Sequence, residues 1–189
     1  MKKQLIKFSI GFALTGILFS ACDKDDDKKE ENKEEVITTM VLKFTRVSTG
    51  STIEFKYDDA DGPGGAAPTK NVITLAPYKT YIVELLLLNK TANGVDIVSE
   101  EVEEEAEAHR FYFEPTAGSN FTVSGFDTDA NNISVGLSST WTTSTAATGK
   151  IKITLRHYAG NPSDKAAADL VNSTKSSTDM EVEFDTIVQ

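Results

Sequence analysis

The chain has 189 residues, of which 39% are hydrophobic, and its formal net charge is −10 at pH 7. This length accommodates one domain of ordinary size. The acidic balance argues against binding nucleic acid or anionic lipid by charge, because both need a surplus of Lys and Arg.

The start of the chain has the pattern of an export signal. Lys2, Lys3 and Lys7 give it a positive charge, an apolar stretch follows over 8–19, and small residues then precede Cys22. The apolar stretch is too short to cross a hydrocarbon core of ~30 Å as a helix. Cys22 is the only cysteine in the sequence, so an internal disulfide is excluded.

The segment Phe19–Cys22 (FSAC) resembles the lipobox of bacterial lipoproteins, although Phe19 stands where that family usually has Leu. The resemblance implies that residues 1–21 are a signal peptide and that Cys22 carries a lipid anchor. Each buried CH₂ of such an anchor contributes ~0.8 kcal/mol, and a stable hold on the membrane needs more than one acyl chain. An ordinary secretory signal with a chance cysteine is the alternative.

An acidic segment follows the cysteine. Residues 23–35 contain no apolar side chain, so we predict that 22–35 form a disordered tether, reaching ~43 Å when extended. The run 23–27 (DKDDD) resembles the export signal of Bacteroidetes surface lipoproteins. That resemblance implies an outer-membrane lipoprotein whose domain faces the outside of the cell. A spacer holding a periplasm-facing domain is the alternative.

From residue 36 onward the dominant hydrophobic period is two, which is typical of strands with one buried face. Such runs occur at 40–45, 53–57, 81–87, 111–113, 121–123, 151–155 and 180–184. They predict an all-β antiparallel sandwich of roughly seven to nine strands over 36–189. Residues 82–88 are apolar on both faces apart from Glu84, which predicts a central strand.

One local motif bears on the type of sandwich. Leu75, Pro77 and Tyr81 have the spacing Leu-x-Pro-x-x-x-Tyr, which resembles the tyrosine corner of fibronectin type III and immunoglobulin-like domains. The resemblance implies that the Leu packs in the core, the Pro fixes a turn and the Tyr hydroxyl bonds to upstream backbone. We carry over an immunoglobulin/fibronectin III-like architecture but not the strand order.

The single predicted helix is short and acidic. It covers Ser99–Ala108, with Ser99 as the N-cap and six glutamates whose mutual repulsion requires compensation. On such a helix Glu105 and His109 share a face, and strand alternation turns His157 toward the sandwich interior or its rim. These three residues are a candidate ligand set for Zn²⁺, Cu²⁺ or Fe²⁺. The alternative is a solvated His109 and a rim His157 that bind no metal.

Two further acidic clusters lie in predicted turns. Asp58, Asp59 and Asp61 resemble part of a Ca²⁺ loop, in which oxygen ligands converge on a turn. The distal Glu of an EF-hand is missing, and Asp is also common in ordinary turns. Asp127 and Asp129 form a second, weaker cluster of this kind.

Trp141 is the only tryptophan. We favour a half-buried position in the sandwich over an exposed platform that stacks on a sugar ring. No GxSxG, phosphate-loop or HExxH motif occurs in the sequence, and an acylated cysteine cannot act as a nucleophile. We therefore predict that the protein is not an enzyme.

Three segments give the chain a resemblance to small Bacteroidetes lipoproteins: Glu100–Glu105, His109 and Leu155–His157. Some of these relatives are labelled type 1 periplasmic-binding-fold proteins, a fold that needs alternating strands and helices and is not expected here. We predict an accessory lipoprotein that binds a metal, a metal chelate or a small nutrient beside an outer-membrane receptor. The alternatives are an adhesive surface domain that contacts protein or glycan and, last, a metal-dependent hydrolase.

Overall fold

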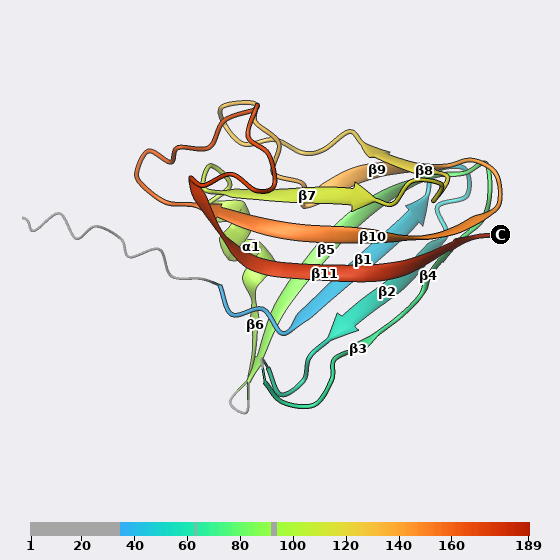
Figure 1. The fold of residues 1–189 in the computed structure, drawn as a ribbon, viewed down its shortest axis with the longest axis horizontal. Helices are drawn as coiled ribbons and strands as arrows, with labels where there is room; N and C mark the ends of the chain where they lie inside the picture. The colour runs from blue at the N-terminus through green and yellow to red at the C-terminus, as the bar shows by residue number, and fades with distance from the viewer. Residues whose placement is uncertain (1–34, 63, 92–93) are drawn as a thin grey trace, which may run out of the picture.

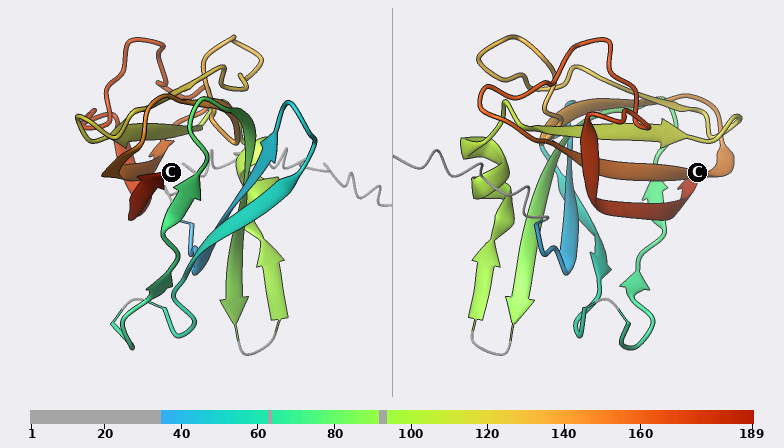
Figure 2. Two further views of the ribbon diagram at one scale, coloured as in Figure 1. Left: turned by 90° about the vertical axis from the view of Figure 1, so that its right-hand side faces the viewer. Right: turned by 60° about the vertical axis from the view of Figure 1, so that its left-hand side comes forward.

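The alternating apolar residues form strands that pack as two facing sheets (Figures 1 and 2). The computed structural model describes residues 35–62, 64–91 and 94–189. Within these residues the predicted all-β sandwich with one short helix is confirmed. The predicted signal peptide, the predicted lipidation site at Cys22 and all but the last residue of the predicted tether lie outside the described residues.

The larger sheet has seven strands in the described residues, in the order β3-β2-β1-β5-β9-β8, with β6 also paired to β5. Their bounds are β1 (Thr39–Arg46), β2 (Thr52–Asp58), β3 (Thr69–Lys70), β5 (Thr80–Thr91), β6 (Gly94–Ile97), β8 (Phe121–Ser124) and β9 (Ser138–Thr143). All its pairs are antiparallel. Because β5 has β1 on one side and β9 on the other, the predicted central strand over 82–88 is confirmed.

The smaller sheet has four strands in the described residues, in the order β4-β11-β10-β7. Their bounds are β4 (Ile73–Leu75), β7 (His109–Pro115), β10 (Ala147–Tyr158) and β11 (Ser176–Val188). The pairs of β10 with β11 and with β7 are antiparallel, whereas β4 runs parallel to β11. This pair departs from the purely antiparallel prediction. It is possible because β4 and β11 are far apart in the chain, so no hairpin sets their relative direction.

The hydrophobic core lies between the sheets. Completely buried side chains on the facing strands include Met40, Leu42, Phe44, Ile151, Ile153 and Leu155. Trp141 is also completely buried, stacked on Phe121 with ring centroids 5.1 Å apart. It therefore lies deeper than the predicted half-buried position, and an exposed sugar-stacking platform is wrong because β9 directs this side chain inward.

The tyrosine-corner residues lie where the chain crosses from β4 in one sheet to β5 in the other. Leu75 and Tyr81 are buried in the core, and Pro77 is half-buried in the connecting turn. The backbone N–H of Ala76 donates a hydrogen bond of 3.2 Å to the Tyr81 hydroxyl oxygen. The tyrosine thus ties the start of β5 to the turn that precedes it, as the motif implies.

The helix α1 spans Val98–Glu104 and is shorter than the predicted Ser99–Ala108. It follows β6 directly (Figure 2, right) with Ile97 at the N-cap position and no side-chain cap, so the predicted cap at Ser99 is wrong. Its first residue and Val102, one turn apart, are buried and fix the helix against the sandwich. Nowhere in the described residues is there a helix long and apolar enough to cross a membrane.

Candidate metal site

The pairing of β7 with β10 brings the two histidines together. Their antiparallel register places His109, the first residue of β7, directly opposite His157 near the end of β10. The ring centroids lie 4.6 Å apart with 33° between the ring planes. Residues opposite each other on antiparallel strands have Cβ atoms ~4.5–5.5 Å apart, so strand pairing alone accounts for their proximity.

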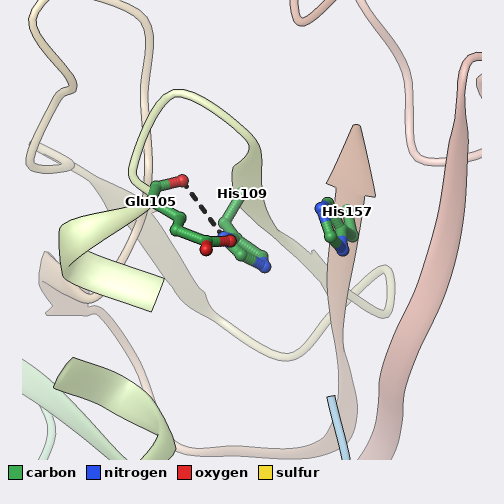
Figure 3. A group of neighbouring side chains, drawn as sticks. All are labelled: Glu105, His109 and His157. Atoms are coloured by element: carbon green, nitrogen blue, oxygen red, sulfur yellow. Dashed lines mark hydrogen bonds between the residues drawn. The ribbon is translucent and has the colours of Figure 1, made fainter. Parts of the chain in front are cut away.

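Glu105 completes a three-residue cluster with these histidines (Figure 3). One carboxylate oxygen of Glu105 and one ring nitrogen each of His109 and His157 lie within 4.8 Å of one another. The predicted reason for this proximity is wrong, because Glu105 is the C-cap residue of α1 and His109 belongs to a strand. A turn, not a shared helical face, connects them. In the described parts of the chain no other group of three or more acidic, His or Cys side chains converges in this way.

A backbone hydrogen bond fixes the tautomer of His109. Its Nδ1 lies 3.1 Å from the carbonyl oxygen of Glu105 (dashed line in Figure 3). A carbonyl oxygen only accepts, so Nδ1 carries the proton and Nε2 has the lone pair. The His109 side chain is completely buried, and its Nε2 has no hydrogen-bond partner among the described residues. A metal-binding histidine usually donates its second nitrogen to a carbonyl or carboxylate in this way.

His109 offers a neutral ring nitrogen. Burial lowers the pKa of His109 from 6.5 to about 4, with smaller contributions in the same direction from His157 and Lys165. Neutral imidazole is the form that binds a metal ion. His157 is half-buried, and its Nδ1 likewise lacks a hydrogen-bond partner within the described chain.

Carboxyl groups crowd the open side of the cluster. Burial, a hydrogen bond shared with Glu101, and the charges of Glu101 and Glu105 raise the pKa of Glu35 to about 7. Carboxylates held this close cannot all ionise without cost. The repulsion inferred from the glutamate-rich sequence is therefore present in the fold, and a bound cation would relieve it.

A buried ion pair holds the turn that carries His109. Lys165 Nζ lies 2.7 Å from a carboxylate oxygen of Asp129, and both side chains are almost completely shielded from water. Lys165 also donates hydrogen bonds to the backbone oxygens of Ala106, at 2.5 Å, and His109, at 2.9 Å. Sequence reasoning missed Lys165, because one lysine in an alanine-rich loop gives no pattern.

Asp179 is a second residue that the sequence analysis missed. Its side chain is completely buried, and Oδ2 lies 3.8 Å from His109 Nε2. Strict alternation along β11 would turn this side chain outward. The register between β10 and β11 shifts between Leu155 and Arg156, which makes Asp179 an extra residue of a β-bulge and turns it inward. A bulge is not visible in a period-two pattern.

The other predicted acidic sites are occupied by structural interactions. The Asp58 carboxylate lies 2.7 Å from both Lys90 Nζ and Thr39 Oγ1, and Asp61 accepts a hydrogen bond from a backbone N–H of its own loop. Over the residues that the structure describes, Asp58, Asp59 and Asp61 do not converge as a metal-binding group. Asp58 and Asp61 thus have structural partners in the sheet and in the turn.

The second acidic cluster also serves to order a loop. Asp127 accepts hydrogen bonds of 2.9 Å from the backbone N–H groups of Gly136 and Ser138. Burial alone would raise the pKa of Asp129, but hydrogen bonds from Lys165 and from backbone N–H groups hold it below its usual range. Neither carboxylate belongs to the converging group described above.

No family model, curated protein or solved structure matches this chain significantly.

The donor atoms set the chemistry of the site. Two imidazole nitrogens with carboxylate oxygens suit Zn²⁺, Cu²⁺ or Fe²⁺ better than the hard ions Ca²⁺ and Mg²⁺, which favour oxygen alone. The Glu105, His109 and His157 cluster therefore favours a transition metal.

Proposed function

We propose that this protein is a non-enzymatic binding module that holds a divalent transition-metal ion at Glu105, His109 and His157. The supporting observation is the convergence of their ligand atoms within 4.8 Å around a buried imidazole that has one nitrogen unpartnered among the described residues. Leaving such a buried polar atom unsatisfied costs ~1–3 kcal/mol. A bound ion would recover this cost and offset the charge of the nearby carboxylates.

The cluster is better suited to binding than to acid–base catalysis. A general base works best when its pKa lies near the operating pH. Burial instead lowers the pKa of His109 to about 4, and the side chain has no exposed surface. His109 is thus placed to hold a ligand, and not to exchange protons with a substrate in solution.

The N-terminal sequence supports a location for this module. Residues 1–21 and the run after Cys22 have the pattern of a lipoprotein signal and an acidic export signal. We propose that Cys22 anchors the protein in the outer membrane, facing the cell exterior, beside a receptor for uptake. Glu35, the last residue of the predicted tether, lies close to Glu101 and Glu105, so the tether would join the folded domain beside the proposed site. Labelling with radioactive palmitate tests this anchor. It would be excluded if the wild-type protein took up no label, or if the Cys22→Ser variant took up as much label as the wild type.

Zinc titration tests the proposed function. The 189-residue chain, purified in mild detergent and stripped of metal, is expected to bind one Zn²⁺ with micromolar or tighter affinity by calorimetry. His157→Ala removes one ligand and is expected to weaken binding at least about tenfold. Glu104→Gln is the matched control, since this exposed glutamate lies next to the cluster but outside it.

Two outcomes would contradict the proposal. Wild-type protein that releases no binding heat at zinc concentrations up to about a hundred micromolar would exclude a functional site of this kind. Equal zinc affinities for His157→Ala and Glu104→Gln would show that the ion binds elsewhere, on the acidic surface.

A further inference from the structure

The three residues of the proposed metal site differ in exposure, and this difference sets the route by which an ion reaches them. Glu105 is exposed, His157 is half-buried, and the His109 side chain is completely buried. Figure 3 shows the Glu105 side chain turned back toward the His109 ring. An ion from solution therefore meets Glu105 and the edge of His157 before it reaches the buried imidazole.

Two further carboxyl groups lie beside Glu105 at this entrance. The side chains of Glu35 and Glu101 share a hydrogen bond, and the charge of Glu105 acts on Glu35. We call Glu35, Glu101 and Glu105 the carboxylate rim. None of its members forms an ion pair with any residue that the structure describes. The last turn of α1, which leads to Glu105, also contains no basic residue.

The basic side chains around the two histidines are directed to other partners. Arg110 donates hydrogen bonds to backbone oxygens of residues 166, 167 and 169. Arg156 bonds to the backbone oxygen of Ser173 and to the Ser176 hydroxyl. Lys165 is paired with a carboxylate inside the loops, as described above. Their positive charges thus serve to order the loops, and the rim keeps its negative charge.

Acidic side chains alone do not make a binding site, but the rim lies in front of a buried donor. His109 Nε2 has no hydrogen-bond partner among the described residues, and its ring belongs to the group whose ligand atoms converge. A cleft lined by one sign of charge concentrates ions of the opposite sign. The same charge repels an anion, which loses affinity at such a surface.

We infer that the site takes its ion as a free hydrated divalent cation and rejects metal complexes of net negative charge, such as those with di- and tricarboxylates. This inference rests on the proposed function and narrows its ligand class. Only coordination changes in this step: water molecules leave the ion as Glu105, His109 and His157 bind it. The carboxylate rim attracts the cation at the entrance and is not itself a fourth ligand.

Equilibrium dialysis of the 189-residue chain tests the inference, with Zn²⁺ and citrate as the probes and each carrying its own radioactive label. Zinc citrate has a net negative charge, so we expect the protein to retain zinc without citrate. Zinc occupancy is expected to follow the concentration of free Zn²⁺, whatever the total concentration of the complex. The buffer is held at pH 8, where the carboxyl groups of the rim are ionised.

A double variant tests the part played by the rim. Glu35→Gln/Glu101→Gln removes two rim charges, keeps the size of both side chains and leaves all three proposed ligands in place. We expect its zinc affinity to fall about three- to tenfold at low ionic strength, and the loss to shrink as salt screens the charges. Glu100→Gln/Glu104→Gln is the matched control, since it removes two exposed glutamates of the same helix that lie outside the rim.

The outcomes separate this inference from the proposed function. Citrate retained with zinc in equal amounts would overturn the inference and leave the three-residue site standing. Equal zinc affinities for the two double variants at low ionic strength would also overturn it, because the rim would then play no part in attracting the ion. Wild-type protein that retains no zinc in citrate-free buffer would overturn the proposed function and this inference with it.

Discussion

One ring nitrogen of His109 has no hydrogen bond to any residue that the structure describes. Its Nδ1 is satisfied by the Glu105 carbonyl, whereas Nε2 has no such partner in the described structure and faces the Asp179 carboxylate. Most buried polar groups in native proteins are satisfied, so an exception needs a physical reason. The proposed metal ion would supply that reason, because it would take the lone pair of Nε2 as a ligand.

Glu35 gives the folded protein a distinctive pH dependence. Its pKa is about 7 when folded against 4.5 ordinarily, so the folded state holds a proton that the unfolded chain releases between these values. Stability from Glu35 is therefore present below pH 4.5 and is lost as the pH rises to about 7. The lowered pKa of His109 acts oppositely, adding stability as the pH rises from about 4 to 6.5.

Glu35→Gln separates these two contributions. The variant lacks the Glu35 titration, so its free energy of unfolding is expected to rise with pH across this window, whereas that of wild type changes less or falls. Urea denaturation of the metal-free proteins at half-unit pH steps from 4.5 to 7.5 measures the difference. A wild-type minus variant difference that stays constant with pH would contradict the assigned titration.

At the scale of elements, register decides what the site contains. The period-two pattern predicted that His157 turns toward the sandwich interior or rim, and the strands that carry it were correctly expected. The pattern does not say which strands pair, so it could not place His109 opposite His157. The prediction that Glu105 and His109 share a helical face was wrong, because α1 ends at Glu104 and His109 begins β7.

The Lys165–Asp129 pair links the loop after β10 to the loop between β8 and β9, and Lys165 also bonds to the turn before β7. Replacing Lys165 by Met leaves a buried carboxylate without its cation, which is expected to cost ~3–5 kcal/mol of unfolding free energy. The double variant Lys165→Met/Asp129→Asn removes both charges, keeps an oxygen for the backbone N–H groups, and is expected to be more stable than Lys165→Met. Urea denaturation measures all three proteins.

An exposed ion pair supplies the comparison. Lys43 and Glu84 lie 2.8 Å apart on the outer surface of the larger sheet, with about half of each side chain exposed. Lys43→Met is therefore expected to cost less than ~1 kcal/mol. Equal losses for Lys43→Met and Lys165→Met would show that the buried pair has no special role in fixing the turn.

At the scale of the molecule, the site lies at the end of the sandwich where α1, β7, β10 and β11 meet (Figure 1). The sandwich, its central strand and the tyrosine-corner crossing could be predicted, because each depends on local spacing of apolar residues. The Asp179 bulge and the Lys165–Asp129 pair could not, because both arise from contacts between segments far apart in sequence. The three-residue cluster was predicted as a set, although its geometry has a different origin.

X-ray absorption at the zinc edge tests the central claim most directly. The 189-residue chain loaded with one equivalent of Zn²⁺ is predicted to show about four nitrogen or oxygen ligands near ~2.0 Å, with the outer-shell scattering of two imidazole rings. His157→Ala is predicted to lose one of the two imidazole contributions. A first shell of about six oxygens without imidazole scattering would contradict the account, since it would place the ion on surface carboxylates and leave both histidines unbound.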